Sequence, residues 1–116
     1  MKLINTDRLL IDELRKISVN AGNAILNEYK SNINIKIKND SSPVTNADLI
    51  SHEIINNSLE KLTPDIPILS EESSNISYEK RKSWDRYWLI YPLDGTKEFI
   101  KQNGEFTVNI ALIVNH

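Results

Sequence analysis

The sequence predicts an α+β or layered α/β protein, with helices and strands mixed around at least one sheet. Two observations support this prediction. Two long segments carry apolar residues at helical spacing, and four shorter segments are apolar or alternate as strands do. The 116 residues contain no repeat, low-complexity tract or linker, so we expect one domain.

Two helices account for much of the apolar content. In residues 6–30 and 44–62 the apolar side chains recur at steps of three and four, which places them on one helical face. They are Leu10, Leu14, Ile17, Ala21, Ala24 and Ile25 in the first helix, and Ile50, Ile54, Ile55, Leu59 and Leu62 in the second. Thr6 or Asp7 is expected to cap the first helix, and Thr63 with Pro64 to end the second.

The strands are expected in four segments. Residues 33–38 alternate strictly between apolar and polar, and residues 106–114 are apolar and β-branched. Two shorter apolar runs, 66–70 and 87–91, are predicted to be buried strands. Of the polar segments, 39–43 has the composition of a turn, 77–86 is expected as a short helix or loop, and 96–102 as one or two helical turns.

Composition excludes several classes of function. The formal charge is −2 and no basic block or stripe appears, so no nucleic-acid polymer is expected as a partner. Because there are no cysteines, disulfides, thiolate metal sites and cysteine nucleophiles are excluded. The first residues become charged too soon for a secretory signal, and no apolar run is long enough to span a bilayer. A cytoplasmic protein is therefore expected.

Acidic residues stand at three comparable places. Asp48 lies at a turn-to-helix junction, Glu71 and Glu72 directly follow the predicted strand 66–70, and Asp94 follows the next strand. Carboxylates at strand ends suit Mg²⁺, a hard cation that prefers oxygen ligands and keeps several waters. A magnesium site is one interpretation of this pattern.

Asp94 is followed by Gly95 and Thr96, a pair suited to binding phosphate. Glycine lets a backbone N–H approach a ligand closely, and Thr96 would open a short helix whose free N–H groups attract an anion. Mg²⁺ beside a phosphate cradle is the combination that phosphate-ester hydrolysis requires.

Each of these carboxylates also has an ordinary structural interpretation. Asp48 lies three residues after Thr45 and is on its own more often the acidic partner in a capping box. Glu71 and Glu72 alone would be a solvated loop pair, and Asp94 with Gly95 is first of all a turn signal. From composition and periodicity the function stays open.

The remaining notable side chains are expected to be structural. His52, in the middle of the second helix, is expected on the surface, and His116 at a frayed terminus. Trp84 and Trp88 are expected in the core or partly buried.

Three motifs taken together resemble the inositol monophosphatase superfamily of Mg²⁺-dependent phosphatases. They are "SPVTNAD", "PDIPILSEES" and "WLIYPLDGTKEFIKQNGEFTVNIALI", and within the superfamily they are most similar to 3'(2'),5'-bisphosphate nucleotidases of the bacterial CysQ type. The resemblance implies a layered αβαβα fold of roughly twice this length. On that basis residues 1–116 are expected to be a single incomplete domain, the N-terminal half of the fold.

The resemblance also implies a set of metal ligands. Glu71 would be a ligand, Asp94 would bind a second metal, and the Leu93 carbonyl would bind the first, with Glu72 the weaker of the acidic pair. The aspartate that bridges both metals in the family is replaced by Tyr91. A neutral phenol with one oxygen is a poor substitute for a carboxylate between ions about 3.5–4 Å apart, so Mg²⁺ binding is expected to be impaired.

The resemblance implies catalytic and substrate-binding roles as well. Asp48 with Thr96 would orient and activate the attacking water. The N–H groups of Gly95 and Thr96 would hold the phosphate, and Glu71 would lie beside the substrate.

The implied activity is hydrolysis of 3'-phosphoadenosine 5'-phosphate to AMP and phosphate. Tyr91, together with the absence of the family's later Trp-Asp motif, leads us to expect a truncated, inactive homologue that is prone to self-association. Two alternatives stay open: an active half of a split phosphatase that takes a nucleotide or an inositol phosphate, and a non-catalytic fragment that binds a nucleotide or a partner. The resemblance also implies an alternative location, at the inner face of the cytoplasmic membrane, where some bacterial proteins of this kind lie.

Overall fold

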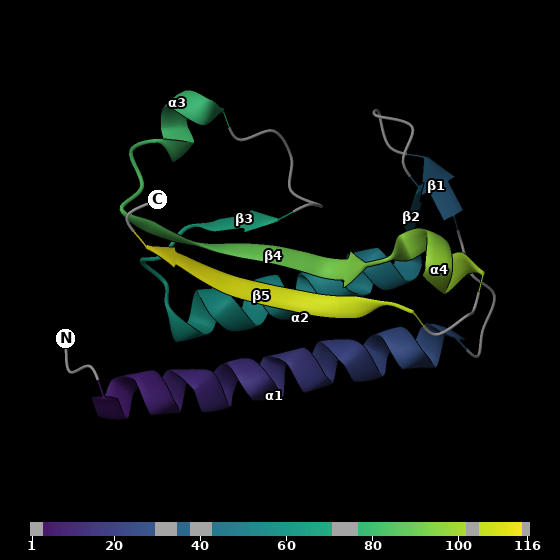
Figure 1. Cartoon of the computed structure of the whole chain (residues 1–116), viewed down its shortest axis with the longest axis horizontal. Helices are drawn as coiled ribbons and strands as arrows, with labels where there is room; N and C mark the ends of the chain where they lie inside the picture. Colours follow the sequence, from purple (N-terminus) through teal and green to yellow (C-terminus); the bar gives the residue numbers. More distant parts are fainter. Residues whose placement is uncertain (1–3, 30–34, 38–42, 71–76, 102–104, 115–116) are drawn as a thin grey trace.

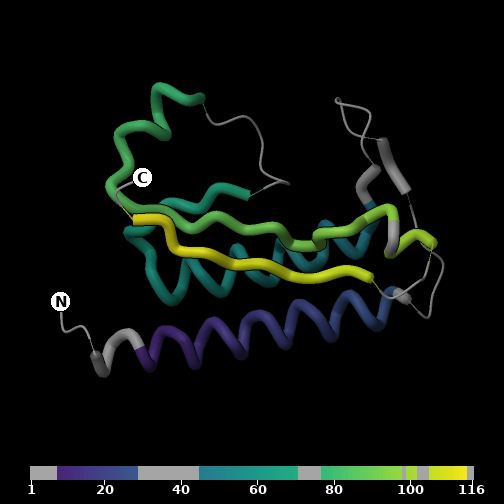
Figure 2. The backbone as a smooth tube through the Cα atoms, in the orientation of Figure 1, coloured from purple at the N-terminus to yellow at the C-terminus, as the bar shows by residue number. Residues whose placement is uncertain are grey.

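A three-stranded sheet covered on one face by two helices forms the centre of the protein (Figures 1 and 2). The structure is a computed structural model and describes residues 4–29, 35–37, 43–70, 77–101 and 105–114. A separate two-stranded hairpin and a short helix lie at one end of the sheet. The predicted mixture of helices and strands is confirmed.

The two long helices, α1 (Ile4–Tyr29) and α2 (Asn46–Leu62), pack against each other and against the sheet. Most of the predicted apolar positions face this core, where Ala21, Ile55 and Leu59 are fully buried. The expected cap of α1 at Thr6 or Asp7 is wrong, because the helix already begins at Ile4. The predicted end of α2 is confirmed: the N–H of Thr63 donates to the Leu59 carbonyl over 2.8 Å.

The sheet consists of β3 (Ile68–Ser70), β4 (Arg86–Asp94) and β5 (Thr107–Val114), in that spatial order. β3 runs parallel to β4, whereas β5 runs antiparallel to it. Trp88 and Ile90 of β4 point into the core beneath the sheet and are fully buried. The Trp88 indole N–H donates to the Thr63 hydroxyl over 2.9 Å, which fastens the end of α2 to β4 and confirms the expected structural role of this tryptophan.

A bulge interrupts β4 just before the candidate site. Tyr91 pairs with Asn109 and Asp94 pairs with Thr107, so three steps along β4 match two along β5. Pro92 lies in the bulge, where the missing N–H is tolerated. Side chains alternate along a regular strand, which would place Tyr91 and Asp94 on opposite faces. The extra residue brings both onto the outer face, away from the helices, and both are exposed.

The hairpin contains a strand that the sequence did not reveal. β1 (Ile35–Ile37) falls within the predicted strand, but its partner β2 (Pro43–Thr45) covers residues expected to form a turn and the start of a helix. The correction has a local cause: Thr45 is extended, with φ −110° and ψ 167°, because it serves as the N-cap of α2.

Two short helices lie between the main elements. α3 (Tyr78–Arg81) occupies part of the predicted short helix or loop, and α4 (Thr96–Ile100) follows β4 directly. Trp84 lies beside Tyr87 with ring centroids 5.6 Å apart and is partly buried, as expected.

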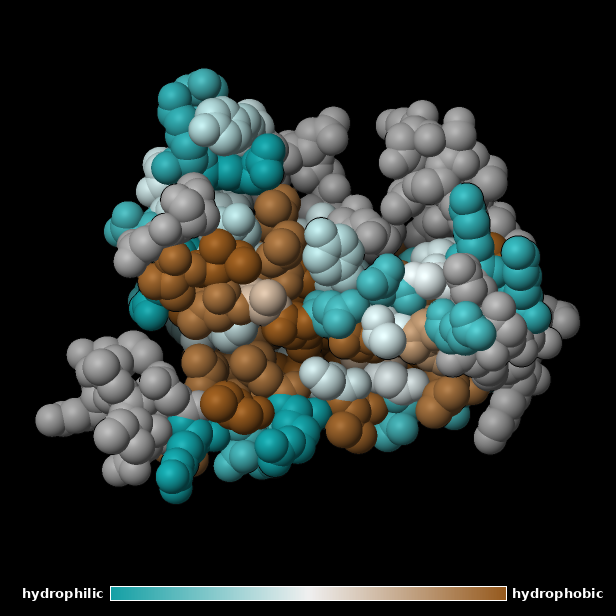
Figure 3. Space-filling model, viewed as in Figure 1, coloured by the Kyte–Doolittle hydropathy of each residue, from teal (hydrophilic) through white to brown (hydrophobic). Residues whose placement is uncertain are grey.

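Apolar side chains remain on the surface near β5 and α1. Figure 3 shows them gathered over the end of the sheet and along the boundary with α1. The most exposed large examples here are Leu9, Ile11, Val19, Leu26 and Val114. β5 is an edge strand of the sheet that the described residues form, and it carries no charged residue.

Candidate active site

A hydrogen bond between Asp48 and Thr96 joins two distant parts of the sequence. The Thr96 hydroxyl donates to Asp48 Oδ1 over 2.8 Å, linking the first turn of α2 to the first residue of α4. The Asp48 side chain is buried and Thr96 is partly buried. The structure thus brings together the two residues assigned to the attacking water, although they lie 48 positions apart.

Asp48 is also the acidic member of a capping box. Its Oδ2 accepts hydrogen bonds from the Thr45 N–H at 2.8 Å and from the Thr45 hydroxyl at 2.6 Å, and the Asp48 N–H donates back to Thr45 Oγ1 at 3.3 Å. The two interpretations of Asp48 are therefore compatible. One carboxylate oxygen caps the helix, and the other contacts Thr96 across the fold.

Asp94, Asn109 and Tyr91 share the outer face of the sheet. The Asn109 side-chain amide donates to Asp94 Oδ2 over 3.4 Å, and Asn109 is the cross-strand neighbour of Tyr91. Tyr91 is 39% exposed. The phenol therefore extends from the same face of the sheet as the Asp94 carboxylate.

Gly95 is required by both its backbone conformation and its surroundings. It has φ 97° and ψ 40°, which side-chain-bearing residues rarely adopt, and an added Cβ would lie 2.8 Å from the Glu105 carbonyl oxygen. Leu93, two residues before Gly95, buries its side chain, and its carbonyl lies 3.4 Å from the Thr96 hydroxyl. The chain therefore turns sharply here between β4 and α4.

The carboxylates and imidazoles of the described residues form no cluster of metal-ligand type. Among them no group of three or more His, Asp or Glu side chains converges. Asp94 offers an exposed carboxylate, one oxygen of which accepts the Asn109 bond, and Leu93 offers a backbone carbonyl; both oxygens of Asp48 accept protein hydrogen bonds. Glu71 and Glu72, the other predicted acidic residues, lie outside the described residues.

Two further side chains of α2 contact the same region, and the sequence interpretation missed both. The Ser51 hydroxyl donates to the Pro92 carbonyl over 2.6 Å, and His52 Nδ1 lies 2.9 Å from the Ser70 hydroxyl oxygen. His52 was expected on the surface, and its side chain is partly buried rather than fully exposed. The signal was the spacing of Asp48, Ser51 and His52 at i, i+3 and i+4, which places them on one helical face. His116 lies outside the described residues.

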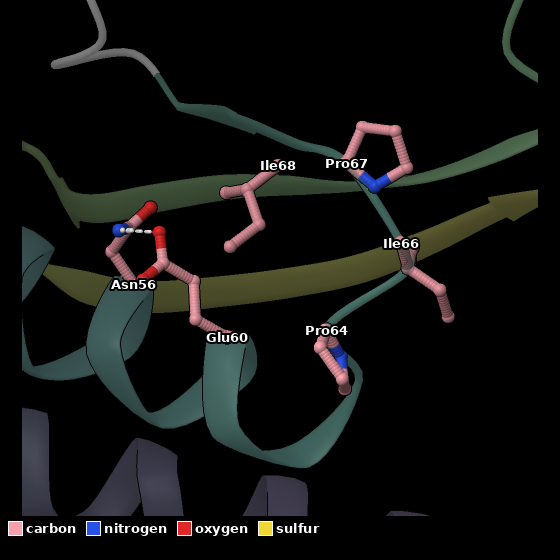
Figure 4. Close-up of a pocket in the computed structure, with 6 residues that line it drawn as sticks. All are labelled: Asn56, Glu60, Pro64, Ile66, Pro67 and Ile68. Atoms are coloured by element: carbon pink, nitrogen blue, oxygen red, sulfur yellow. Dashed lines mark hydrogen bonds between the residues drawn. The ribbon is translucent and has the colours of Figure 1, made fainter.

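A surface pocket of about 490 Å³ lies at the other end of β3. Figure 4 shows the six residues that line it: Asn56, Glu60, Pro64, Ile66, Pro67 and Ile68. Its one carboxylate, on Glu60, accepts a hydrogen bond from the Asn56 amide over 3.0 Å. The pocket contains none of the predicted site residues.

The comparisons with known proteins bear on the family and the fold. The model of the inositol monophosphatase family matches residues 8–116.

The chain belongs to the inositol monophosphatase family.

The similar curated proteins include the 3'(2'),5'-bisphosphate nucleotidase CysQ of Escherichia coli O6:H1, which is 53% identical over 106 residues. That alignment covers 90% of this chain and 43% of the relative. CysQ of Buchnera aphidicola is 45% identical, over 94% of this chain and 42% of its own length. The chain thus spans less than half the length of the curated relatives that it matches.

Solved structures confirm the fold that the sequence predicted. The extragenic suppressor protein suhB from Bartonella henselae superposes with a TM-score of 0.80 at 28% identity, covering 92% of this chain and 41% of that one. CysQ from Bacteroides thetaiotaomicron is described as a bacterial member of the inositol monophosphatase family. It superposes with a TM-score of 0.68 at 46% identity, covering 85% of this chain and 35% of that one. The predicted α+β class and the resemblance to this family are both confirmed.

Proposed function

We propose that this chain carries part of the active site of a Mg²⁺-dependent phosphatase that converts 3'-phosphoadenosine 5'-phosphate to AMP and phosphate, and that Tyr91 leaves the site inactive. The observation that supports the site most directly is the Asp48–Thr96 hydrogen bond, at 2.8 Å between α2 and α4. The choice of substrate rests on the similarity to curated CysQ nucleotidases, of which 53% identity to the Escherichia coli protein is an example.

Thr96 is suited to orienting a water molecule. Its hydroxyl has one proton, which is directed to Asp48 Oδ1, so the lone pairs on Thr96 Oγ1 are available to accept a hydrogen bond from water. Asp48 is held by its two bonds to Thr45 and cannot turn away. The pair would therefore hold the water. As the water oxygen approaches phosphorus, Thr96 Oγ1 would accept one water proton while the Thr96 proton passes to Asp48 Oδ1.

The turn after β4 would receive the phosphate. The backbone N–H groups of Gly95 and Thr96 begin α4, and no side chain caps this end of the helix. Glu71 would complete the side of the site that follows β3. Bound Mg²⁺ would supply charge neutralisation of the phosphate oxygens and acidification of the water. Leu93, Asp94 and Glu71 are the residues we assign to holding it.

Tyr91 is the reason for proposing inactivity. On the outer face beside Asp94, the phenol offers one neutral oxygen. An aspartate there would offer two oxygens that share one negative charge. The phenol also fills more space than an aspartate, in the position where the cation would lie. We expect the binding of at least one Mg²⁺ to fail, while the Asp48–Thr96 pair beneath stays intact.

The proposed partners are small phosphorylated molecules, with an inositol phosphate as the second candidate substrate, and we place the protein in the cytoplasm. In the part of the chain that the structure describes, no helix has both the length and the apolar character needed to cross a membrane.

A nucleotide titration tests the site and an activity assay tests the inactivity. We would record amide shifts of the Tyr91→Asp variant with 3'-phosphoadenosine 5'-phosphate and Mg²⁺, and expect the largest changes at Gly95 and Thr96. Unchanged shifts there would overturn the assignment of the phosphate site. In the activity assay, the unmodified chain is expected to release no phosphate above blank from 3'-phosphoadenosine 5'-phosphate with Mg²⁺. The Escherichia coli CysQ is the positive control. Mg²⁺-dependent turnover by the unmodified chain would show that Tyr91 does not disable it.

A further inference from the structure

The first two turns of α2 contact three separate segments that lead into the candidate site. Asp48, Ser51 and His52 project from one face of the helix. Their partners are the hydroxyl of Thr96, the carbonyl of Pro92 and the hydroxyl of Ser70. These partners belong to α4, β4 and β3 respectively. One helical face therefore contacts the start of α4 and the carboxyl ends of both parallel strands.

The contact between His52 and Ser70 is one of the interactions that hold the end of β3. The two atoms, His52 Nδ1 and Ser70 Oγ, are 2.9 Å apart, and Ser70 is only 6% exposed. β3 is three residues long and pairs with β4 alone among the described strands. So short a strand has few ladder bonds to fix its end, and a side-chain bond from the helix beneath adds substantially to its restraint.

The position of Ser70 links this bond to the candidate site. Ser70 is paired with Ile90, one residue before Tyr91, so β3 ends level with the point where β4 enters its bulge. The Ser51 bond holds the bulge itself through the Pro92 carbonyl. The two bonds from adjacent residues of α2 thus set the ends of β3 and β4 relative to each other.

Only the beginning of α2 makes these contacts with the strand ends. Asp48, His52, Asn56 and Glu60 follow one another at intervals of four and form a polar row along α2. Farther along this row the Asn56 amide donates to Glu60 within the helix instead (Figure 4). The pocket at that end is lined by α2, by the loop before β3 and by the first residue of β3, and not by the carboxyl ends of the strands. His52 is therefore the member of this polar row that lies beside the carboxyl end of β3.

We propose that His52 is a positioning residue, which through Ser70 fixes the carboxyl end of β3 beside the β4 bulge and so sets the spacing of the strand ends that form the phosphatase site. Its significance for the site rests on the function proposed above. The bond itself does not depend on that function, because it joins residues of the protein without any ligand.

Amide hydrogen exchange of the full chain, without metal or substrate, tests the bond. His52→Leu and Ser70→Ala should each speed exchange of the β3 amides by about 5- to 30-fold, with smaller changes in β5. His52→Asn, which keeps a polar atom near the place of Nδ1, should restore protection to within about threefold of the unmodified chain. Glu53→Leu is the matched control, since it adds the same side chain at an exposed neighbouring position.

Three results would overturn the proposal. They are unchanged β3 exchange in Ser70→Ala, a uniform increase over β3, β4 and β5 in His52→Leu, and failure of His52→Asn to restore protection. A spectrum that correlates the imidazole nitrogens with their ring protons adds an independent readout, because the His52 Nδ1 signal should shift in Ser70→Ala and stay fixed in Glu53→Leu.

A Mg²⁺ titration separates this proposal from the proposed function. In the Tyr91→Asp background, His52→Leu should weaken Mg²⁺ binding about fivefold or more, and His52→Asn should not. If Tyr91→Asp binds no Mg²⁺ while the exchange results hold, the proposed function fails and the positioning role stands. If Mg²⁺ binds equally well with and without His52, the positioning role fails and the proposed function stands.

Discussion

Replacing Tyr91 by aspartate should create a cation site on the outer face of the sheet. Tyr91 is 39% exposed and the bulge in β4 turns it to the same face as Asp94. The substitution removes no buried side chain, so the fold should tolerate it. The cross-strand neighbour Asn109, whose amide lies 3.4 Å from Asp94 Oδ2, shows that the two positions share one small area.

The size of the effect follows from the added charge. Near a protein surface, two unit charges about 4 Å apart interact by about 4 kcal/mol, so a carboxylate and the divalent Mg²⁺ interact by about 8 kcal/mol. Dehydration of Mg²⁺ and of the carboxylate offsets most of this attraction. If about a sixth of it remains, the gain is about 1.4 kcal/mol, which corresponds to a tenfold lower Kd for Mg²⁺.

Calorimetric titration with MgCl₂ measures this difference. The matched control is Tyr91→Asn, which has nearly the size of the aspartate variant but no charge. A second control, Tyr91→Asp combined with Asp94→Asn, removes the proposed partner carboxylate. We expect tighter binding only in Tyr91→Asp with Asp94 intact.

Two results would refute this reasoning. Equal Kd values for Tyr91→Asp and Tyr91→Asn would show that the charge at this position does not reach a bound cation. Tight binding that survives Asp94→Asn would show that the cation lies elsewhere, and the inferred role of the bulge would then be wrong.

Three further predictions concern stability and association. Thr96→Val keeps the side-chain shape but removes the bond to Asp48, and should lower the free energy of unfolding by about 1.5–3 kcal/mol in urea; a loss below about 0.5 kcal/mol would mean that the bond contributes little. Gly95→Ala meets both a φ of 97° and the Glu105 carbonyl, so it should cost about 2 kcal/mol or more, seen as a lower Tm; an unchanged Tm would contradict the strain. The uncharged edge of β5 should make the chain self-associate, and Ala111→Lys, at an exposed position, should lower its sedimentation-average mass. A monomeric unmodified chain with one sharp melting transition would contradict that last expectation.

The sequence by itself determined the two long helices and most of the sheet. The apolar spacing in α1 and α2 requires a core on one side, and Ala21, Ile55 and Leu59 are fully buried there. The strands β3, β4 and β5 were visible because each is a run of apolar residues with polar segments on both sides. The family was recognisable for a similar reason: its motifs are short, contiguous and arranged in a fixed order.

Local sequence was less informative where an element is short. β2 was missed because three residues contain too little pattern to separate a strand from a turn. The start of α1 was placed too late because a polar residue inside the first turn has the same chemistry as an N-cap.

Tertiary structure alone decided how the candidate site is arranged. The bulge at Pro92 reverses the alternation of β4 and puts Tyr91 and Asp94 on one face, and only pairing with β5 reveals it. Asp48 meets Thr96 and His52 meets Ser70 because α2 packs beneath the ends of two parallel strands. Such contacts join residues 18 to 48 positions apart. Periodicity reports only the face on which a residue lies, whereas the fold determines which residue it meets.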